Sequence, residues 1–250
     1  MESPTYVALS AQVALRQQLE VVANNVANAN TTGYKPDKQI FQSYLSKLDV
    51  PGGSVSFVQD RATFIDVTEG PMNPTGNSLD IAVKGDGMLA VAGPGGQTLY
   101  TRDGHLQTGQ DGTLQTVGGL PVLGPDGSQI QLPPDYTRVR ITADGQVTVR
   151  VKGNDQQVGQ IGLYRTDRPQ MLRKQGAATF SAPPGAMNPV EQGDTRTGIV
   201  QGALEGSTVQ PVREIANLTE LSRAYDRLQT LLSDDSDREK KMIETLGSPQ

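Results

Sequence analysis

Few residues in this sequence could act in catalysis or bind a metal, and their spacing matches no known type of active site. The only histidine, His105, follows Asp103-Gly104 and has no cysteine or paired carboxylate beside it. Such a histidine is a poor candidate for a metal ligand or a catalytic base. The absence of cysteine excludes thiol nucleophiles and zinc sites of the cysteine type. We therefore predict no catalytic, cofactor-binding or metal-binding residues and interpret His105 as a surface or strand-packing residue.

Aspartate and glycine recur in pairs that resemble ligand loops only superficially. The pairs are Asp86-Gly87, Asp103-Gly104, Asp111-Gly112, Asp126-Gly127 and Asp144-Gly145. They lack the spacing of a calcium-binding EF-hand, and Gly85-Asp86-Gly87 lacks the pattern of a nucleotide-binding loop. Because both residues tolerate positive φ, Asp-Gly is favoured in tight hairpin turns. We interpret the pairs as turns.

Composition and charge narrow the class of protein further. The chain has 250 residues with 28 Gly and 16 Pro, which indicates many turns and mostly short strands. Its net charge of −5 makes nucleic acid and anionic membranes unfavourable partners. No run approaches the roughly 20 apolar residues of a membrane-spanning helix, and the start lacks a secretory signal pattern. These facts predict a cytoplasmic protein, unless export uses no cleavable signal.

The centre of the chain, from about Leu79 to Val200, has the pattern of an antiparallel β domain. Strand-like runs lie between the Asp-Gly pairs at 79–83, 88–91, 139–142, 147–151 and 161–164. Residues 147–151 alternate between apolar and polar types, which predicts one buried and one exposed face. With a helical pattern at each end of the chain, the expected fold class is α+β.

The N-terminal segment has the 3.6-residue period of one amphipathic helix. The stripe consists of Ala8, Ala11, Leu15, Leu19, Val22 and Val26. Ser3 and Pro4 suit the N-cap and the first helical position, and Gly33 suits the left-handed position just after a helix. We expect a helix of about 25 residues, at 1.5 Å rise per residue.

A second helical stripe lies near the C-terminus. Its members are Val212, Ile215, Leu218, Leu221, Tyr225, Leu228 and Leu232. Asp234, Asp235 and Asp237 then interrupt the stripe, and Ser236 with Glu239 could form a capping box that starts a second short helix. One continuous helix with an acidic solvated patch is the alternative, and the sequence leaves both open.

These patterns divide the chain into four parts. We expect an N-terminal axial helix at 1–34, an extended connecting segment at 35–78, a β-rich domain at 79–200 and a C-terminal axial helix at 201–250. The two terminal helices would together form an axial helical domain.

The N-terminal helix is unusually poor in charge. Between Ser3 and Tyr34 only Arg16 and Glu20 are charged, whereas a helix with one face in water normally carries more. Small and amide side chains opposite the stripe suit packing against further chains, as in an open head-to-tail filament. The alternative is a two-helix stalk packed on its own β domain. The predicted subunit-interface residues are Leu15, Leu19, Val22, Asn24, Asn25, Val26, Asn28, Ile215, Leu218, Tyr225 and Leu228.

Three motifs resemble those of flagellar axial proteins of the rod and hook. They are 23–35 (ANNVANANTTGYK), 79–87 with 100–104 and 112–124, and 200–209 followed by Glu214 and 223–225. The family usually has Asn at the position of Thr208. The threonine in this sequence is expected to weaken a side-chain hydrogen bond there. The opening at 6–25 and the run 205–212 are most similar to the proximal-rod members, with distal-rod or hook-type subunits as the alternative.

This resemblance implies a structural role and no enzymatic activity. A rod subunit would be exported unfolded through the flagellar type III export gate, without a cleaved signal peptide. It would then join itself and other rod subunits in the basal body, without inserting into a membrane and without a cofactor. Phe41 and Leu45 fit the short pattern of an export signal, although an anchor packed on the core explains them equally well. A secreted β-rich binding module is the alternative from another class.

Overall fold

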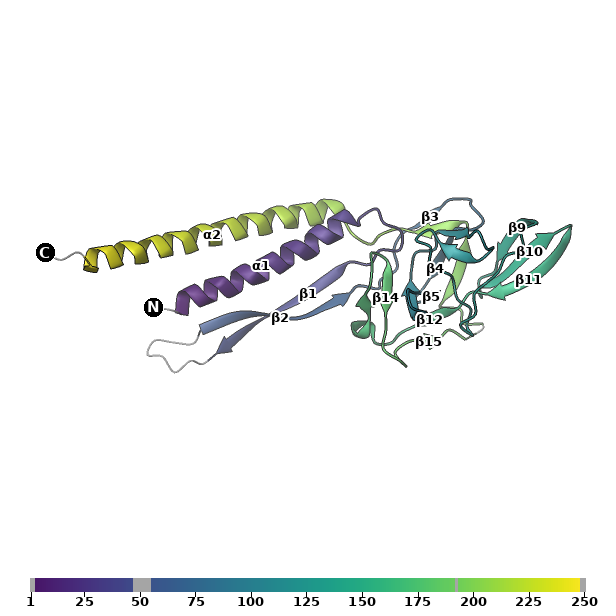
Figure 1. The fold of residues 1–250 in the computed structure, drawn as a ribbon, viewed down its shortest axis with the longest axis horizontal. Coiled ribbons are helices and arrows are strands. Elements are labelled where there is room, and N and C mark those ends of the chain that lie inside the picture. The colour runs from purple at the N-terminus through teal and green to yellow at the C-terminus, as the bar shows by residue number, and fades with distance from the viewer. Residues whose placement is uncertain (1–2, 47–54, 192, 248–250) are drawn as a thin grey trace. The chain divides into compact units, whose positions relative to one another are not determined.

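The computed structural model describes residues 3–46, 55–191 and 193–247, and the chain forms two compact units (Figure 1). The helical unit consists of the N-terminal part up to Ala27, residues Asp37–Thr63, and the C-terminal part from Gln210. The β unit consists of Asn28–Pro36 and Phe64–Val209.

The helical unit contains two long helices, α1 (Ser3–Ala27) and α2 (Pro211–Gly247), and a two-stranded sheet of β1 (Asp37–Ser46) and β2 (Val55–Ile65). The helices lie side by side in Figure 1 and contact each other. Gln12 Nε2 of α1 donates a hydrogen bond to the Tyr225 hydroxyl of α2 at 3.2 Å. At 1.5 Å per residue α1 is about 37 Å long and α2 about 55 Å.

Helix α2 runs without a break through the acidic stretch at 234–237. Asp234 and Asp237 are exposed there, so their charges remain in solvent and do not interrupt the backbone hydrogen bonds. Of the two alternatives left open by the sequence, the structure has the continuous helix. Among the described residues no helix is long and apolar enough to cross a membrane.

The β unit is built from short antiparallel strands. A six-stranded sheet has the order β13-β14-β6-β5-β12-β15, and a three-stranded sheet has the order β11-β10-β9. Three further pairs, β16-β4, β17-β3 and β7-β8, complete the unit. The bounds are β3 Met72–Pro74, β4 Ile81–Lys84, β5 Met88–Ala92, β6 Thr98–Thr101, β7 Leu106–Thr108, β8 Leu114–Thr116, β9 Tyr136–Ile141, β10 Gln146–Val151, β11 Asn154–Gln160, β12 Leu163–Arg165, η1 (3₁₀) Pro169–Met171, β13 Arg173–Lys174, β14 Thr179–Ser181, β15 Asn188–Pro189, β16 Gly198–Gln201 and β17 Ala203–Glu205.

The core of the β unit is formed by aliphatic side chains at alternate strand positions. Ile81, Val83, Leu89, Val91 and Leu114 belong to one buried cluster, to which β9 and β10 also contribute. Val147 and Val149 are fully buried while Arg150 is exposed, which confirms the alternation predicted for this strand. The fold is therefore α+β with a central antiparallel region, as predicted.

Two local predictions are wrong. Helix α1 ends at Ala27, so Gly33 does not occupy the position after the helix. Its left-handed φ of +66° serves a close approach to Arg102 instead. Asp103-Gly104 does not form a turn. Glycine is required at position 104 because a Cβ there would lie 1.8 Å from the Ile81 carbonyl oxygen. At both positions, backbone contacts between segments far apart in the sequence require glycine.

Candidate functional site

Three charged residues from distant parts of the chain meet inside the β unit. Lys35 follows the loop after α1, Arg102 follows β6, and Glu205 ends β17. Lys35 Nζ lies 2.6 Å from Glu205 Oε1, and Arg102 Nη1 lies 3.2 Å from Glu205 Oε2. All three side chains are completely buried. We call Lys35, Arg102 and Glu205 the ionic cluster.

Backbone groups satisfy most of the remaining polar atoms of the ionic cluster. Glu205 Oε1 also accepts a hydrogen bond from the Gly70 amide at 2.7 Å. Lys35 Nζ donates to the Thr68 carbonyl, and Arg102 Nη2 donates to the Gly85 carbonyl at 2.6 Å. A buried charge is tolerated when it is paired and hydrogen-bonded in this way. Within the ionic cluster, only Arg102 Nε is buried without a partner.

The backbone draws the same segments together. The Gly33 amide donates to the Glu205 carbonyl oxygen at 2.8 Å. A Cβ on Gly33 would lie 2.4 Å from the Arg102 carbonyl carbon, so any side chain there would force the segments apart. The segment that follows α1 and the segment that precedes α2 are therefore fastened at one point.

Tyr34 forms a second layer next to the ionic cluster. Its side chain is fully buried, and Lys174 Nζ lies 4.1 Å from the centre of its ring. The same ammonium group donates to the Lys35 carbonyl at 3.1 Å. Cation–π contacts of this kind are worth about 0.5–2 kcal/mol. Strand β13 thus holds the Tyr34-Lys35 backbone in place.

The electrostatics of the ionic cluster indicate a structural site. Burial lowers the pKa of Lys35, and the Glu205 carboxylate opposes this shift by favouring the ammonium form. With two cations around one anion, Glu205 is the group that keeps both positive charges acceptable in the interior. Among the described residues no group of His, Cys, Asp or Glu could hold a metal ion. The arrangement provides an anchor and offers no solvent-accessible reactive group.

The predicted interface residues of α1 differ in their surroundings. Leu15, Leu19, Val22 and Val26 are half-buried, and Asn24 is exposed. Asn25 is only 3% exposed, and its side chain is paired with the backbone of Asp37. Asn25 Nδ2 donates to the Asp37 carbonyl at 3.2 Å, and the Asp37 amide donates to Asn25 Oδ1 at 3.2 Å. Asn25 therefore fixes the start of β1 within the helical unit.

The other predicted interface residues belong to α2, except Asn28. Leu218, Tyr225 and Leu228 are half-buried, and Ile215 is 51% exposed. Asn28 lies in the β unit, where its side-chain oxygen accepts a hydrogen bond from the Thr31 hydroxyl at 3.2 Å. The structure thus places these eleven residues in two units.

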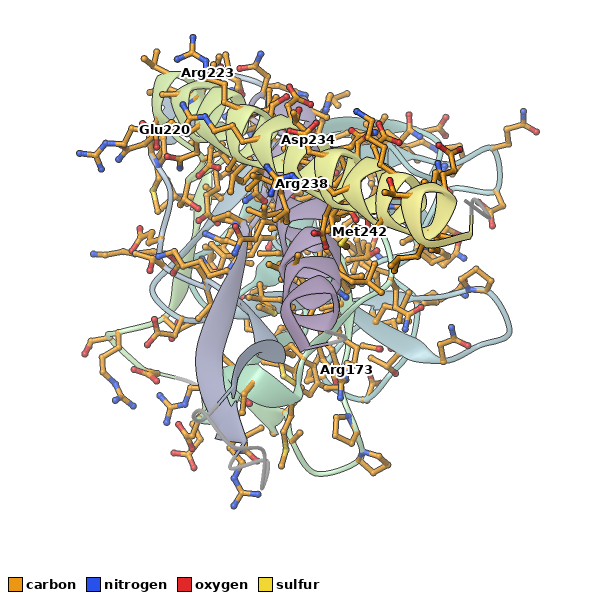
Figure 2. All side chains as sticks on the ribbon, turned by 90° about the vertical axis from the view of Figure 1, so that its left-hand side faces the viewer. Arg173, Glu220, Arg223, Asp234, Arg238 and Met242 are labelled. Carbon is orange, nitrogen blue, oxygen red and sulfur yellow. The ribbon has the colours of Figure 1, made fainter. Side chains whose placement is uncertain are left out.

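Several exposed apolar residues lie outside the predicted stripes. They are Leu9 and Val13 on α1 and Leu231, Met242, Ile243 and Leu246 on α2. Charged side chains also project from α2, among them Glu220, Arg223 and Arg238 (Figure 2). A single apolar stripe on each helix does not predict these residues, because they extend the apolar surface beyond one face.

The remaining candidates add little chemistry. Phe41 and Leu45 belong to strand β1, and the structure describes their backbone but not their side chains. His105 has a side chain that is 48% exposed, with Nε2 3.9 Å from Asp80 Oδ1. The Thr208 hydroxyl is buried without a hydrogen-bond partner.

Sequence reasoning did not find the ionic cluster. A usable signal was present, because Lys35, Arg102 and Glu205 each lie within one of the three recognised motifs. A charged residue inside each of three specific motifs suggests that the motifs meet through charge pairing. Local periodicity could not reveal this, because 170 positions separate Lys35 from Glu205.

Comparisons with known proteins agree with the three motifs. Residues 6–35 match the family model of the flagella basal body rod protein. Residues 82–149 match the D1 domain of flagellar hook protein FlgE/F/G, and residues 200–245 match the C-terminal region of the flagellar basal body rod FlgEFG proteins. Each match includes one member of the ionic cluster.

Similarity to individual relatives extends over most or all of the chain. The chain is 38% identical to the flagellar basal-body rod protein FlgF of Caulobacter vibrioides and 36% identical to that of Mesorhizobium japonicum, covering 99% of both chains in each case. It is 35% identical to the flagellar basal-body rod protein FlgG of Agrobacterium fabrum, over 88% of this chain and 90% of the relative.

The fold, the motifs and the relatives define a flagellar axial protein. The chain belongs to the family of flagellar basal-body rod proteins. The predicted resemblance to this family, including its similarity to the FlgF members, is confirmed.

Proposed function

We propose that this protein is a structural subunit of the proximal part of the bacterial flagellar basal-body rod. It polymerises with itself and with other rod subunits into the shaft that transmits torque from motor to hook. The observation that carries the proposal is the character of α1. It combines two charged residues with apolar side chains on more than one face, within a chain of the rod family.

The charge and exposure of α1 support enclosure by other molecules. Arg16 Nε and Glu20 Oε1 lie 3.2 Å apart, so the two charges of this helix neutralise each other. Leu9 and Val13 are 51% and 53% exposed. Burying such a side chain fully is worth roughly 1.5–3 kcal/mol. Contacts with neighbouring subunits would bury these residues together with Leu15, Leu19, Val22, Asn24 and Val26.

Coupled folding and assembly follow from this proposal. The terminal helices form an axial helical domain whose ordering is completed only against neighbouring subunits. Ile215, Leu218, Tyr225 and Leu228 of α2 contribute the second apolar stripe, and the β unit between the helices folds independently. The four parts of the chain at 1–34, 35–78, 79–200 and 201–250 would then act as two axial helices, a connection and a β-rich domain.

The route and place of assembly complete the proposal. The chain leaves the cytoplasm unfolded through the flagellar type III export gate, without a cleaved signal peptide, and Phe41 and Leu45 are candidates for the export signal. It acts within the basal body as a structural protein without enzymatic activity or cofactor. Neither nucleic acid nor membrane insertion is involved.

Helix substitutions test the assembly role. We expect Leu15→Asp or Val22→Asp to abolish rod completion in a strain that lacks the wild-type gene, because a buried carboxylate opposes subunit packing. Gln129→Asp, on the exposed surface of the β unit, is the matched control and should assemble normally. The measurement is electron microscopy of isolated basal bodies. Complete rods in both helix variants would refute the proposed interface.

A further inference from the structure

One face of the three-stranded sheet of β9, β10 and β11, whose strands are labelled in Figure 1, carries several cations. Arg138 and Arg140 lie on β9 and Arg150 lies on β10, and all three are exposed. The register places Arg138 directly opposite Arg150. The alternate residues of these strands, including Val139 and Val149, are buried in the core. We call Arg138, Arg140, Arg150, Lys152 and Asp155 the arginine face.

The arginine face has too little negative charge to neutralise it. Like charges directly opposite each other in an antiparallel pair destabilise the sheet. Asp155 forms a double hydrogen bond with Arg150, at 2.7 Å to Nε and 2.9 Å to Nη2. This bond, helped by the charges of Arg140 and Arg138, lowers the pKa of Asp155. Within the described part of the chain, Arg138 and Arg140 form no ion pair.

A second feature that lowers the stability of this sheet is the backbone strain in the turn that joins β10 to β11. Lys152 has a φ of +50° and is the only residue other than glycine with positive φ in the described ranges. Two-residue hairpin turns of this kind favour Asn, Asp or Gly at that position. A lysine there adds a fourth cation to the same three-stranded sheet at the expense of backbone strain. Two independent departures from the most stable sequence therefore concentrate positive charge at one place.

We propose that the arginine face is an interaction surface for the acidic surface of a second copy of this chain. The chain carries 22 basic and 27 acidic residues, for a net charge of −5. The arginine face contributes four basic residues and one acidic residue, so the rest of the chain has 18 − 26 = −8. Any copy of the chain is therefore an anionic partner for the arginine face of another copy.

The chemistry of arginine fits this partner. The planar guanidinium group binds carboxylates through two parallel hydrogen bonds, and it retains its charge in an interface. Contact between two different patches is head-to-tail, and such contacts generate open helical assemblies when the rotation between copies does not close a ring. The surface thus extends the proposed function, on which it rests, by adding a contact made by the β unit to those made by the helices.

Cross-linking in assembled rods tests the contact directly. Since the natural chain has no cysteine, Arg140→Cys provides a single site for a photoactivatable thiol-reactive cross-linker. We expect a dimer adduct whose digest joins the peptide containing position 140 to an acidic peptide of a second copy. Arg168→Cys, also exposed but outside the arginine face, is the matched control and should not give that adduct. No adduct, or an adduct only with another protein, overturns the proposal.

A charge-removal variant separates binding from stability. Arg138→Gln/Arg140→Gln relieves the repulsion around Arg150, so the β unit should keep its urea midpoint or gain stability. The same variant should reduce the low-salt self-association constant of the full chain at least tenfold in sedimentation velocity. Arg168→Gln/Arg173→Gln makes the same charge change elsewhere and should leave association unchanged. The proposal is overturned if both double variants weaken self-association equally, or if Arg138→Gln/Arg140→Gln leaves self-association unchanged. It is also overturned if the wild-type chain is purely monomeric.

Failure of the proposed function and failure of the arginine-face contact give different results. If the proposed function fails, Leu15→Asp leaves rods complete. If only the arginine face fails, Leu15→Asp still blocks assembly, while the arginine variants behave like their controls.

Discussion

Replacement of Glu205 by Gln tests the physical role of the ionic cluster most directly. The substitution keeps the size of the side chain and removes the only negative charge among three completely buried groups. Lys35 Nζ, 2.6 Å away, and Arg102 Nη1, 3.2 Å away, would then be buried without a counterion. Removing one partner of a buried pair typically costs about 3–5 kcal/mol. Because small domains have a total stability of about 5–15 kcal/mol, we expect the β unit to become marginal.

Urea unfolding of the full chain provides the assay. The protein has no tryptophan, and of its seven tyrosines Tyr34, Tyr100, Tyr136 and Tyr164 lie in the β unit while the other three lie in the helical unit. A loss of near-ultraviolet circular dichroism that precedes the loss of the far-ultraviolet helical signal therefore follows the β unit. The helical signal in the far ultraviolet should change much less. Asp155→Asn removes one carboxylate from an exposed pair, whose side chains are 44% and 57% exposed, and serves as the control. We expect the control to change the urea midpoint far less than Glu205→Gln, because exposed ion pairs contribute little to stability.

A compensating substitution makes the test sharper. Lys35→Met in the Glu205→Gln background restores the original net charge of the ionic cluster, because one cation is removed along with the anion. The double variant should therefore be more stable than Glu205→Gln alone, with a coupling energy of about 0.5–3 kcal/mol. If Glu205→Gln costs no more than the exposed control, or if Lys35→Met brings no recovery, the assigned role of Glu205 is wrong.

Three further outcomes are expected. Gly33→Ala should destabilise the β unit by about 1–3 kcal/mol in the same urea assay, because φ is +66° and the new Cβ would lie 2.4 Å from backbone. Thr208→Val should leave the stability of the β unit unchanged or raise it, because the buried Thr208 hydroxyl has no hydrogen-bond partner. Thr113→Val should lower that stability by about 1 kcal/mol, because it removes the 2.7 Å hydrogen bond from the Thr113 hydroxyl to Asp111. A larger loss for Thr208→Val than for Thr113→Val would contradict this reasoning. Hydrogen bonds from Thr113, chiefly its hydroxyl, lower the pKa of Asp111 below 3.8, so its contribution is present above that pH and is lost as pH falls through the lowered pKa. Asp111→Asn should therefore flatten the decline of the urea midpoint below about pH 4.

Local features of the fold could be predicted from the sequence because they depend on short-range periodicity. The stripe of α1 and the alternation at 147–151 predict the correct element types, and Val147, Val149 and Arg150 face the expected sides. The continuity of α2 could not be decided, because exposed aspartates are compatible with both a helix and a cap.

Features that depend on contacts between distant segments could not be predicted in this way. Lys35, Arg102 and Glu205 have the composition of surface residues when each is considered alone. Their burial follows from the meeting of three distant chain segments, which no window of local sequence contains. Gly33 is similar: its positive φ is expected from the sequence, but the reason for it is a backbone 69 positions away, at Arg102. Motif recognition locates these residues without explaining why the motifs exist.

The ionic cluster gives the three family motifs a common physical purpose. Lys35 comes from the first motif, Arg102 from the second and Glu205 from the third, so the two cations have a counterion only when the third motif is present. Any shorter part of the chain that ends before Glu205 contains two cations whose burial is uncompensated. Under the proposed export of an unfolded chain, the β unit therefore cannot form the complete ionic cluster until Lys35, Arg102 and Glu205 have all passed. The sequence separation of 170 positions thus links the completion of this fold to the completion of delivery.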